Sequence, residues 1–310
     1  MDLSKIEIEK EVQIIFMGTP VFAVPVLQGL LDNYKVRAVV TQPDKGAYSP
    51  IKKLALDNNI LVLQPHKIKE EFKEIIDLEP SLIVTCAYGQ IIPEEVLDCP
   101  RLGCVNVHAS LLPKLRGGAP IHKAIIEGHK KTGITIMYMN PKMDEGDIIS
   151  QEEVVIEDTD TASSLHDKLS IVGRDLLLKT LPSIIDGTNT RTAQNNQEAT
   201  LAFTIKREDE KISFNKTVKQ VVNQIRGLNG WPGAYCIFEG KILKVWSSYA
   251  TDNYPTGFNG AITSLYKDGF GVKVSNGEVV FTCVQLEGKN KVSGIDFING
   301  KENLVGKILQ

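Results

Sequence analysis

The 310-residue chain is predicted to be an α/β protein: a mainly parallel, doubly wound sheet in its first half and a smaller β-barrel in its second. In the first half, short apolar runs alternate with amphipathic stretches, which is the pattern of successive strand and helix units. In the second half, short strand-like runs are separated by turn sequences at hairpin spacing, which favours a small barrel. The length is sufficient for two domains that each bury a core.

The elements of the first half follow from these patterns in chain order. Short apolar runs predict strands at residues 12–17, 36–40, 60–63, 82–86, 104–107 and 134–139. Helical spacing of apolar residues predicts helices at residues 22–32, 50–57, 67–76, 93–97, 120–128 and 161–185. The last helix is expected to pack on the outside of this domain.

Beyond residue 185 the composition changes. Residues 186–199 are rich in Gly, Asn, Thr and Gln, which predicts an exposed connection. A helix is expected at residues 218–226, and turn signals stand at residues 238–240, 266–269 and 275–277. The expected organisation is therefore a domain at 1–185, a connection at 186–206 and a second domain at 207–310.

Composition places the protein among ordinary soluble chains, with 42% hydrophobic and 24% charged residues. No apolar run approaches the length of a membrane span, and residues 1–11 are charged rather than signal-like, so we expect a cytoplasmic protein with no membrane partner. No cysteine pair or cluster has zinc-ligand spacing, so we expect no metal and reduced structural thiols at Cys86, Cys99, Cys104, Cys236 and Cys283.

The net charge of −3 argues against strong nucleic-acid binding by the chain as a whole. From Lys206 onward, however, 14 Lys and Arg face 10 Asp and Glu, whereas the remainder has 21 against 28. Chance scatter of solvated charges is one interpretation of this asymmetry. The other is a basic second domain that touches an RNA backbone.

Polar residues at the end of one predicted strand form the candidate catalytic site. Asn106 and His108 lie two residues apart, hence on one face, at the carboxyl end of a strand, where ligands bind in open parallel sheets. Taken singly, each is better interpreted as a satisfied core residue. Together with the carboxylate of Asp144, they provide donors for a tetrahedral oxyanion and a route for a proton, as acyl transfer to an amine requires.

Longer sequence words support the catalytic interpretation. Asn-x-His-x-Ser-Leu-Leu-Pro at 106–113, Arg-Gly-Gly-Ala-Pro at 116–120 and Met-Asp-x-Gly-Asp at 143–147 resemble the folate-dependent formyltransferases. The resemblance extends over nearly the whole chain and implies a Rossmann-like domain followed by an OB-like, tRNA-binding barrel.

The resemblance also implies an activity. The formyl group of 10-formyltetrahydrofolate would pass to the amino group of initiator methionyl-tRNA, in translation initiation, with one chain as the working unit. Asn106 and His108 would stabilise the oxyanion and relay a proton, and Asp144 would orient and charge His108.

Two loops are candidates for binding the folate. The first follows a strand end and contains a glycine, as suits a backbone loop around a flat ring; it comprises Ala87, Tyr88, Gly89, Gln90, Ile91 and Ile92. The second offers a hydroxyl and an apolar wall, and comprises Ser110, Leu111, Leu112 and Pro113. An ordinary strand-to-helix turn and a rigid proline loop are the alternatives; the resemblance implies that both loops bind folate. A dinucleotide role is not expected, because Gly18 does not begin a Gly-x-Gly-x-x-Gly motif.

Candidates for tRNA contact are Arg116, Lys45, Lys206 and Arg207. Arg116 could position a phosphate or ribose, or be a surface arginine without a role. Lys206 and Arg207 are predicted to lie along the acceptor end, or to belong to a solvated charge run at 206–211. In the resembled family a long basic loop normally follows Thr-Gln-Pro-Asp; here the interval Lys45 to Ser49 is short, so either fewer contacts suffice or part of that loop is missing.

The sequence is also compatible with two other functions. Formyltransferases acting on a sugar nucleotide or on glycinamide ribonucleotide share Asn-x-His and the distal Asp, but Asn223-Gln-Ile-Arg-Gly227 and Trp231-Pro232 in the second half favour tRNA. A non-catalytic RNA-binding or folate-sensing protein could have the same fold. Such a protein has no need of all three catalytic candidates.

Overall fold

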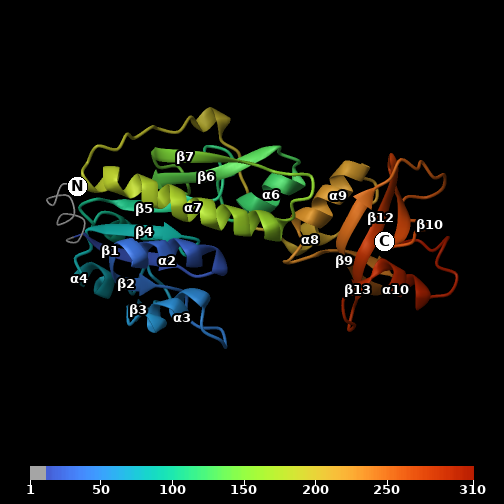
Figure 1. Cartoon of the computed structure of the whole chain (residues 1–310), viewed down its shortest axis with the longest axis horizontal. Coiled ribbons are helices and arrows are strands. Elements are labelled where there is room, and N and C mark those ends of the chain that lie inside the picture. The colour runs from blue at the N-terminus through green and yellow to red at the C-terminus, as the bar shows by residue number, and fades with distance from the viewer. Residues whose placement is uncertain (1–11) are drawn as a thin grey trace. The chain divides into compact units, whose positions relative to one another are not determined.

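A computed structural model describes residues 12–310 (Figure 1). The expected charged start, residues 1–11, lies outside the described residues. The chain forms two compact units. The first comprises the chain up to Pro120, Lys131–Val155 and His166–Phe203, and the second comprises Ile121–Lys130, Ile156–Leu165 and Thr204–Gln310.

The first unit contains a seven-stranded sheet in the order β3-β2-β1-β4-β5-β6-β7. Its strands are β1 (Gln13–Gly18), β2 (Lys35–Val40), β3 (Leu61–Leu63), β4 (Leu82–Cys86), β5 (Cys104–His108), β6 (Lys131–Tyr138) and β7 (Ile148–Val155). The strands β1 to β5 pair in parallel, whereas β6 runs antiparallel to β5 and β7 antiparallel to β6. The predicted mainly parallel α/β fold is confirmed.

The central strands are mostly apolar, because both faces of the sheet are covered. In β1, the side chains of Ile14, Ile15, Phe16 and Met17 are completely buried. Burial on both faces produces a continuous apolar run rather than an alternating one. The edge strand β7 was not predicted, for the opposite reason, since its sequence Ile-Ile-Ser-Gln-Glu-Glu-Val-Val is half-exposed and polar in the middle.

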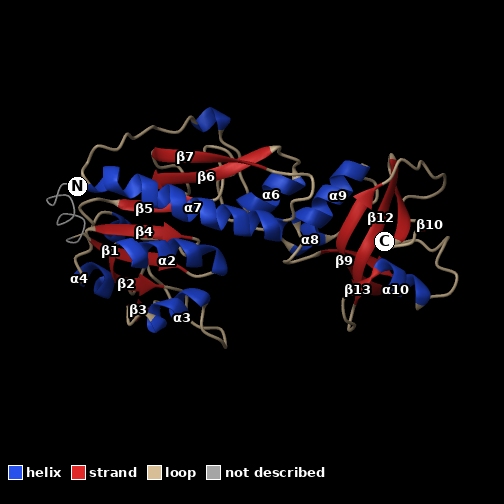
Figure 2. Ribbon diagram, in the orientation of Figure 1, coloured by secondary structure: helices blue, strands red, loops and turns tan. Residues whose placement is uncertain are grey.

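Helices flank the strands (Figure 2). They are η1 (Val21–Ala23), α2 (Val24–Asn33), α3 (Pro50–Asp57), α4 (Lys73–Asp77), α5 (Glu94–Leu97) and α7 (Ala162–Ile185), which belongs to this unit from His166 onward. The helix α6 (Pro120–Ile126) belongs to the second unit from Ile121 onward. The prediction of helix from residue 67 is wrong, because residues 67–72 form turns. The backbone N–H groups of Glu70 and Glu71 donate to Lys67 O at 2.9 and 3.0 Å, and the N–H of Ile68 donates to Gln90 Oε1 at 2.9 Å. This stretch is therefore a single turn that is bonded to a neighbouring loop.

The second unit contains an antiparallel sheet in the order β10-β11-β12-β9-β8, with β13 paired to β12. Its elements are α8 (Arg207–Glu210), α9 (Val218–Gly227), β8 (Ala234–Phe238), β9 (Lys241–Ala250), β10 (Ile262–Leu265), β11 (Phe270–Val274), β12 (Gly277–Leu286), β13 (Val292–Ser293) and α10 (Gly294–Asn299). The predicted turns connect β8 to β9, β10 to β11 and β11 to β12. Glu239 and Gly240 have φ of 49° and 76°, as a two-residue hairpin turn requires.

The end of the chain joins the two edges of this sheet. The backbone of Gln310 exchanges hydrogen bonds of 2.7 and 3.0 Å with Ile237 in β8, and Leu309 N donates to Gly260 O at 2.8 Å, just before β10. Ile308 also pairs with Ala261. These contacts close the sheet into a small barrel. Within residues 12–310, we find no helix with the length and apolarity needed to cross a membrane.

Candidate active site

Asn106 is oriented by the strand beside it. Thr85 of β4 pairs with Asn106 of β5, and the Thr85 hydroxyl donates to Asn106 Oδ1 at 2.8 Å. The side-chain carbonyl is thereby occupied, whereas Asn106 Nδ2 has no hydrogen-bond partner within residues 12–310. The interpretation of Asn106 as a satisfied core residue therefore holds for Oδ1 but not for Nδ2, which is available as a hydrogen-bond donor.

His108 lies two residues further along β5 and is 6% exposed. Its Nε2 is 3.1 Å from the carbonyl oxygen of Leu115, and its Nδ1 is 3.6 Å from Asp144 Oδ1. An imidazole with an oxygen at each nitrogen can donate to both only when it is protonated on both. The structure thus brings together two residues that are widely separated in the sequence and supplies the ring with an anionic neighbour.

Asp144 lies in the loop between β6 and β7, with the unusual φ of +53°. Its Oδ2 accepts a hydrogen bond of 2.8 Å from the backbone N–H of Gly117. Gly117 has φ of +120°, and a Cβ there would lie 2.8 Å from the carbonyl oxygen of Ala202. Glycine at 117 is therefore required by both backbone conformation and close approach, and its N–H holds the Asp144 carboxylate in place.

The first predicted folate loop follows β4 and turns through Ala87 and Gly89, which have φ of 50° and 88°. Tyr88 is buried, and burial raises its pKa to about 12, with Glu71 adding to the effect. The Gln90 amide donates to the carbonyl of Pro65 at 3.1 Å. Ile92 is also buried, whereas Ile91 is 69% exposed. Most of the larger side chains of this loop therefore hold its backbone in place.

The second predicted folate loop is braced from several sides. The Ser110 hydroxyl is buried and donates to the carbonyl of Lys114 at 2.6 Å, so its proton is used within the loop. Thr135 of β6 accepts from Leu112 N at 3.1 Å, and Gln151 of β7 donates to Leu112 O at 2.9 Å. Leu111 and Pro113 are half-buried. Sequence reasoning missed Thr85, Thr135 and Gln151; a polar residue inside an apolar strand was the available signal for the two threonines.

Arg116 is not a surface arginine, because its side chain is 4% exposed. Its guanidinium donates to Gln194 Oε1 from Nε at 3.0 Å and from Nη2 at 2.7 Å, and Nη2 also donates to Asn196 Oδ1 at 2.8 Å. Nη1 lies 3.3 Å from Glu145 Oε1. The surface-arginine alternative is therefore wrong. The predicted contact of Arg116 with tRNA is not supported either, because the guanidinium is directed at Gln194, Asn196 and Glu145.

The other predicted RNA contacts are exposed. Lys45 lies in the loop between β2 and α3. Lys206 Nζ is 3.8 Å from Glu208, and Arg207 forms an ion pair with Glu210 while its guanidinium lies 4.1 Å from the centre of the Tyr235 ring. Glu210 itself is buried. The stretch 206–211 is therefore not simply a solvated charge run.

No group of three or more His, Cys, Asp or Glu residues within 12–310 is arranged to hold a metal ion. The five cysteines are free thiols. Burial raises the pKa of Cys236 to about 12 and raises the pKa values of Cys86 and Cys104 as well. These thiols are protonated at neutral pH and are poor nucleophiles.

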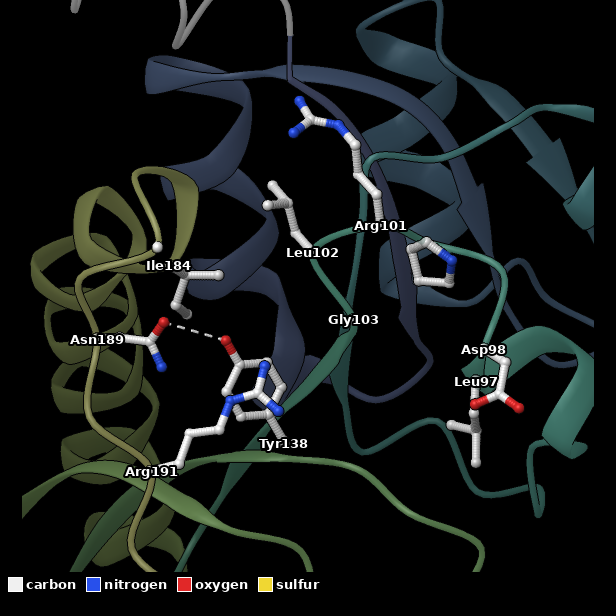
Figure 3. Close-up of a pocket in the computed structure, with 11 residues that line it drawn as sticks. Leu97, Asp98, Arg101, Leu102, Gly103, Tyr138, Ile184, Asn189 and Arg191 are labelled. Atoms are coloured by element: carbon white, nitrogen blue, oxygen red, sulfur yellow. Dashed lines mark hydrogen bonds between the residues drawn. The ribbon is translucent and has the colours of Figure 1, made fainter.

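A hollow of about 450 Å³ lies beside Gly103, which precedes β5, whereas His108 ends that strand (Figure 3). None of the catalytic candidates lines it. The Arg191 guanidinium lies over the Tyr138 ring, 3.8 Å from its centre, and the Tyr138 hydroxyl donates to Asn189 Oδ1 at 3.2 Å (Figure 3). The hollow therefore marks where residues after α7 attach to β6.

Both halves of the chain are similar to known proteins. Residues 10–181 match the family described as formyl transferase, and residues 204–302 match the formyl transferase C-terminal domain. The chain is 48% identical over 304 residues to a methionyl-tRNA formyltransferase of Macrococcus caseolyticus, covering 95% of this chain and 97% of that one. It is also 48% identical over 308 residues to the Bacillus subtilis protein of the same name, covering 96% and 97%.

A solved structure is similar over most of its length. WlaRD, a sugar 3N-formyl transferase crystallised in the presence of dTDP and 5-N-formyl-tetrahydrofolate, superimposes with a TM-score of 0.68 at 25% identity. The superposition covers 90% of this chain and 99% of that one.

Proposed function

The chain belongs to the formyl transferase family, and from this premise we propose that it transfers the formyl group of 10-formyltetrahydrofolate to the amino group of initiator methionyl-tRNA. The observation that carries the proposal is the extent of the relationship. Two methionyl-tRNA formyltransferases are 48% identical to the chain across both units and not only across the catalytic sheet. The product is formylmethionyl-tRNA for translation initiation.

Asn106 supplies a donor to the formyl oxygen. Because the Thr85 hydroxyl occupies Asn106 Oδ1, the amide is fixed with Nδ2 available. When the amine attacks, the formyl oxygen gains negative charge, and a donor already in place stabilises that charge without reorganisation.

His108 and Asp144 act as a pair. The Asp144 carboxylate, 3.6 Å from Nδ1, orients the ring and stabilises positive charge on it in the transition state. The Nε2 proton, directed at Leu115 O in this structure, is offered to the developing oxyanion. As the C–N10 bond breaks, this proton passes to the N10 nitrogen of the departing tetrahydrofolate, and the proton lost by the amine replaces it on the ring.

The division of labour between the domains is also proposed. Residues 1–185 bind the folate through the loops Ala87 to Ile92 and Ser110 to Pro113, and residues 207–310 bind the tRNA backbone. The proposed contacts are Arg207 of this second domain, Lys206 of the connection and Lys45 of the first domain. The proposed connection is residues 186–206, of which 186–203 pack as part of the first compact unit. All the catalytic candidates lie in one chain, so a monomer is the proposed active form. Initiator tRNA is aminoacylated and used in translation in the cytoplasm, so we propose the cytoplasm as the compartment of this protein.

The test is a formylation assay with purified protein, 10-formyltetrahydrofolate and methionyl-tRNA, in which the amino acid released by deacylation is analysed by mass spectrometry. Formylmethionine is the expected product. The similarity to a sugar formyl transferase makes a dTDP-linked amino sugar the proper competing acceptor, with glycinamide ribonucleotide as a further one. Formylation of either competitor but not of methionyl-tRNA would refute the proposed acceptor, and no formylation of any acceptor would favour a non-catalytic protein.

A further inference from the structure

The segment after α7 was expected to be an exposed connection, and most of its residues are exposed. It is nevertheless bonded to the first unit along its length. Thr192 and Ile148 exchange backbone hydrogen bonds of 2.8 and 2.9 Å, and the Tyr138 contacts of Asn189 and Arg191 precede them (Figure 3). Further along, Arg116 N donates to Thr200 O at 2.9 Å and Ala202 N donates to Arg116 O at 2.7 Å.

Gln194, in the middle of this segment, holds the loop that carries Asp144. Its Nε2 donates to the backbone carbonyls of Asp144 and Gly146, each at 2.8 Å. Its Oε1 accepts both bonds from the Arg116 guanidinium. Both protons of the amide are therefore used, and a reversed amide would place its oxygen against two carbonyls and its NH2 against a cation.

The loop held by Gln194 is one that needs support. Asp144 has a left-handed backbone conformation, which is unfavourable for a residue with a side chain and persists only where neighbours enforce it. Gly146 allows no freedom, since a Cβ there would lie 1.8 Å from Tyr138 O. The two carbonyls bonded by Gln194 are those of Asp144 and Gly146, so this amide fixes the backbone from which the catalytic carboxylate projects.

Arg116 fixes Gln194 in turn. Because Arg116 is almost fully buried, its charge needs compensation, and Glu145 provides it from within the same loop at 3.3 Å. We infer that Gln194 and Arg116 are positioning residues for the formyl transfer proposed above: they set Asp144 against His108, and the connecting segment is thereby a built part of the catalytic site. This inference rests on the proposed function.

Gln194→Glu is the decisive variant. It keeps the side-chain shape and strengthens attraction to Arg116, but it replaces the two donated bonds by a carboxylate oxygen facing two carbonyls. We expect kcat to fall by up to about a hundredfold, the scale of a small misplacement of catalytic groups, while KM for both substrates stays within about twofold. Gln197→Ala is the matched control, because Gln197 is exposed in the same segment, and it should keep wild-type rates.

Coupling to Asp144 separates positioning from general stabilisation. In an Asp144→Asn background, Gln194→Glu should cause no further loss of kcat, because its effect passes through that carboxylate. Arg116→Lys, which keeps the charge and removes the paired bonds to Gln194, should behave in the same way and decides the matter if Gln194→Glu does not fold, as judged by thermal unfolding.

Wild-type kcat in the folded Gln194→Glu variant, a change confined to KM, or losses that multiply in the double variant would overturn the inference. An active wild-type enzyme with an unaffected variant refutes only the positioning role. A wild-type protein that formylates no acceptor would refute the proposed function and this inference with it.

Discussion

Replacing Asp144 by Asn should leave the protein folded and nearly inactive. The Asn side chain has almost the same shape, and its oxygen can still accept the 2.8 Å bond from Gly117 N. What disappears is the negative charge that faces His108. The variant therefore isolates the electrostatic contribution of this carboxylate from its contribution to the loop.

The distance sets the magnitude. Two unit charges separated by the 3.6 Å between His108 Nδ1 and Asp144 Oδ1 interact by about 4–5 kcal/mol at an effective dielectric constant of about 20. Only the part of this interaction that strengthens in the transition state changes the rate. If His108 gains its full charge there, kcat falls by up to roughly a thousandfold, since each factor of ten corresponds to about 1.4 kcal/mol.

Single-turnover formylation with saturating donor and acceptor measures this loss directly, and thermal unfolding checks the fold. Asp147→Asn is the matched control: it removes a carboxylate three residues away whose side chain has no hydrogen bond or ion pair within residues 12–310, and it should react at the wild-type rate. If Asp144→Asn retained most of its single-turnover rate, or if Asp147→Asn lost as much, the pairing of His108 with Asp144 would not be the source of catalysis.

Three further outcomes are expected. Asn106→Asp should lower kcat by about a hundredfold to a thousandfold, because it removes the free Nδ2 donor; rapid-quench measurement of a near-normal rate would contradict that role. Glu278 is fully buried in the barrel, and its pKa lies below the ordinary 4.5. Burial raises this pKa, but hydrogen bonds from side chains that include Thr263 and Tyr266 lower it by more. The carboxylate therefore stabilises the folded state above pH 4.5, and this contribution is lost as the pH falls through the lowered pKa. Thermal unfolding of Glu278→Gln should thus depend less on pH in the acid range than that of the wild type, and parallel curves would refute the assignment. Replacing Lys206 and Arg207 by Ala should make the slope of log tRNA affinity against log salt concentration less steep, by about 0.7–0.9 for each phosphate that is no longer neutralised. The affinity for the formyl donor should not change. An unchanged slope would assign the phosphate binding to other cations.

The strands of the parallel sheet were predictable because burial on both faces leaves a signal inside each strand. Five apolar runs lie where β1 to β5 lie, and the polar residues that interrupt β5 are the two that face the candidate site. Strand β7 lacked the signal, because an edge strand needs no continuous apolar sequence. Helix α4 begins later than expected, because the residues before it form a turn closed on Lys67 O and bonded to Gln90.

The candidate site divides in the same way. Asn106 and His108 share a face by the two-residue period of a strand, which is a local property, and so the sequence alone places them together. The contact between His108 and Asp144 depends on how a loop folds over a neighbouring strand, and the sequence words identified Asp144 only by resemblance. Arg116 shows the limit most clearly: a cation beside two glycines indicated exposure, yet it is buried among Gln194, Asn196 and Glu145.

By itself, then, the sequence determined the alternation of strands and helices, the hairpin turns of the barrel and the residue types of the site, since each of these depends on neighbours in the chain. Only the tertiary structure decided that the last residues join β8 to the start of β10, that Thr85 orients Asn106, and that a connecting segment holds the Asp144 loop through Gln194. Each of these is a hydrogen bond between residues distant in the sequence. Such partners are selected by geometry and burial, and they leave no periodic pattern in the chain.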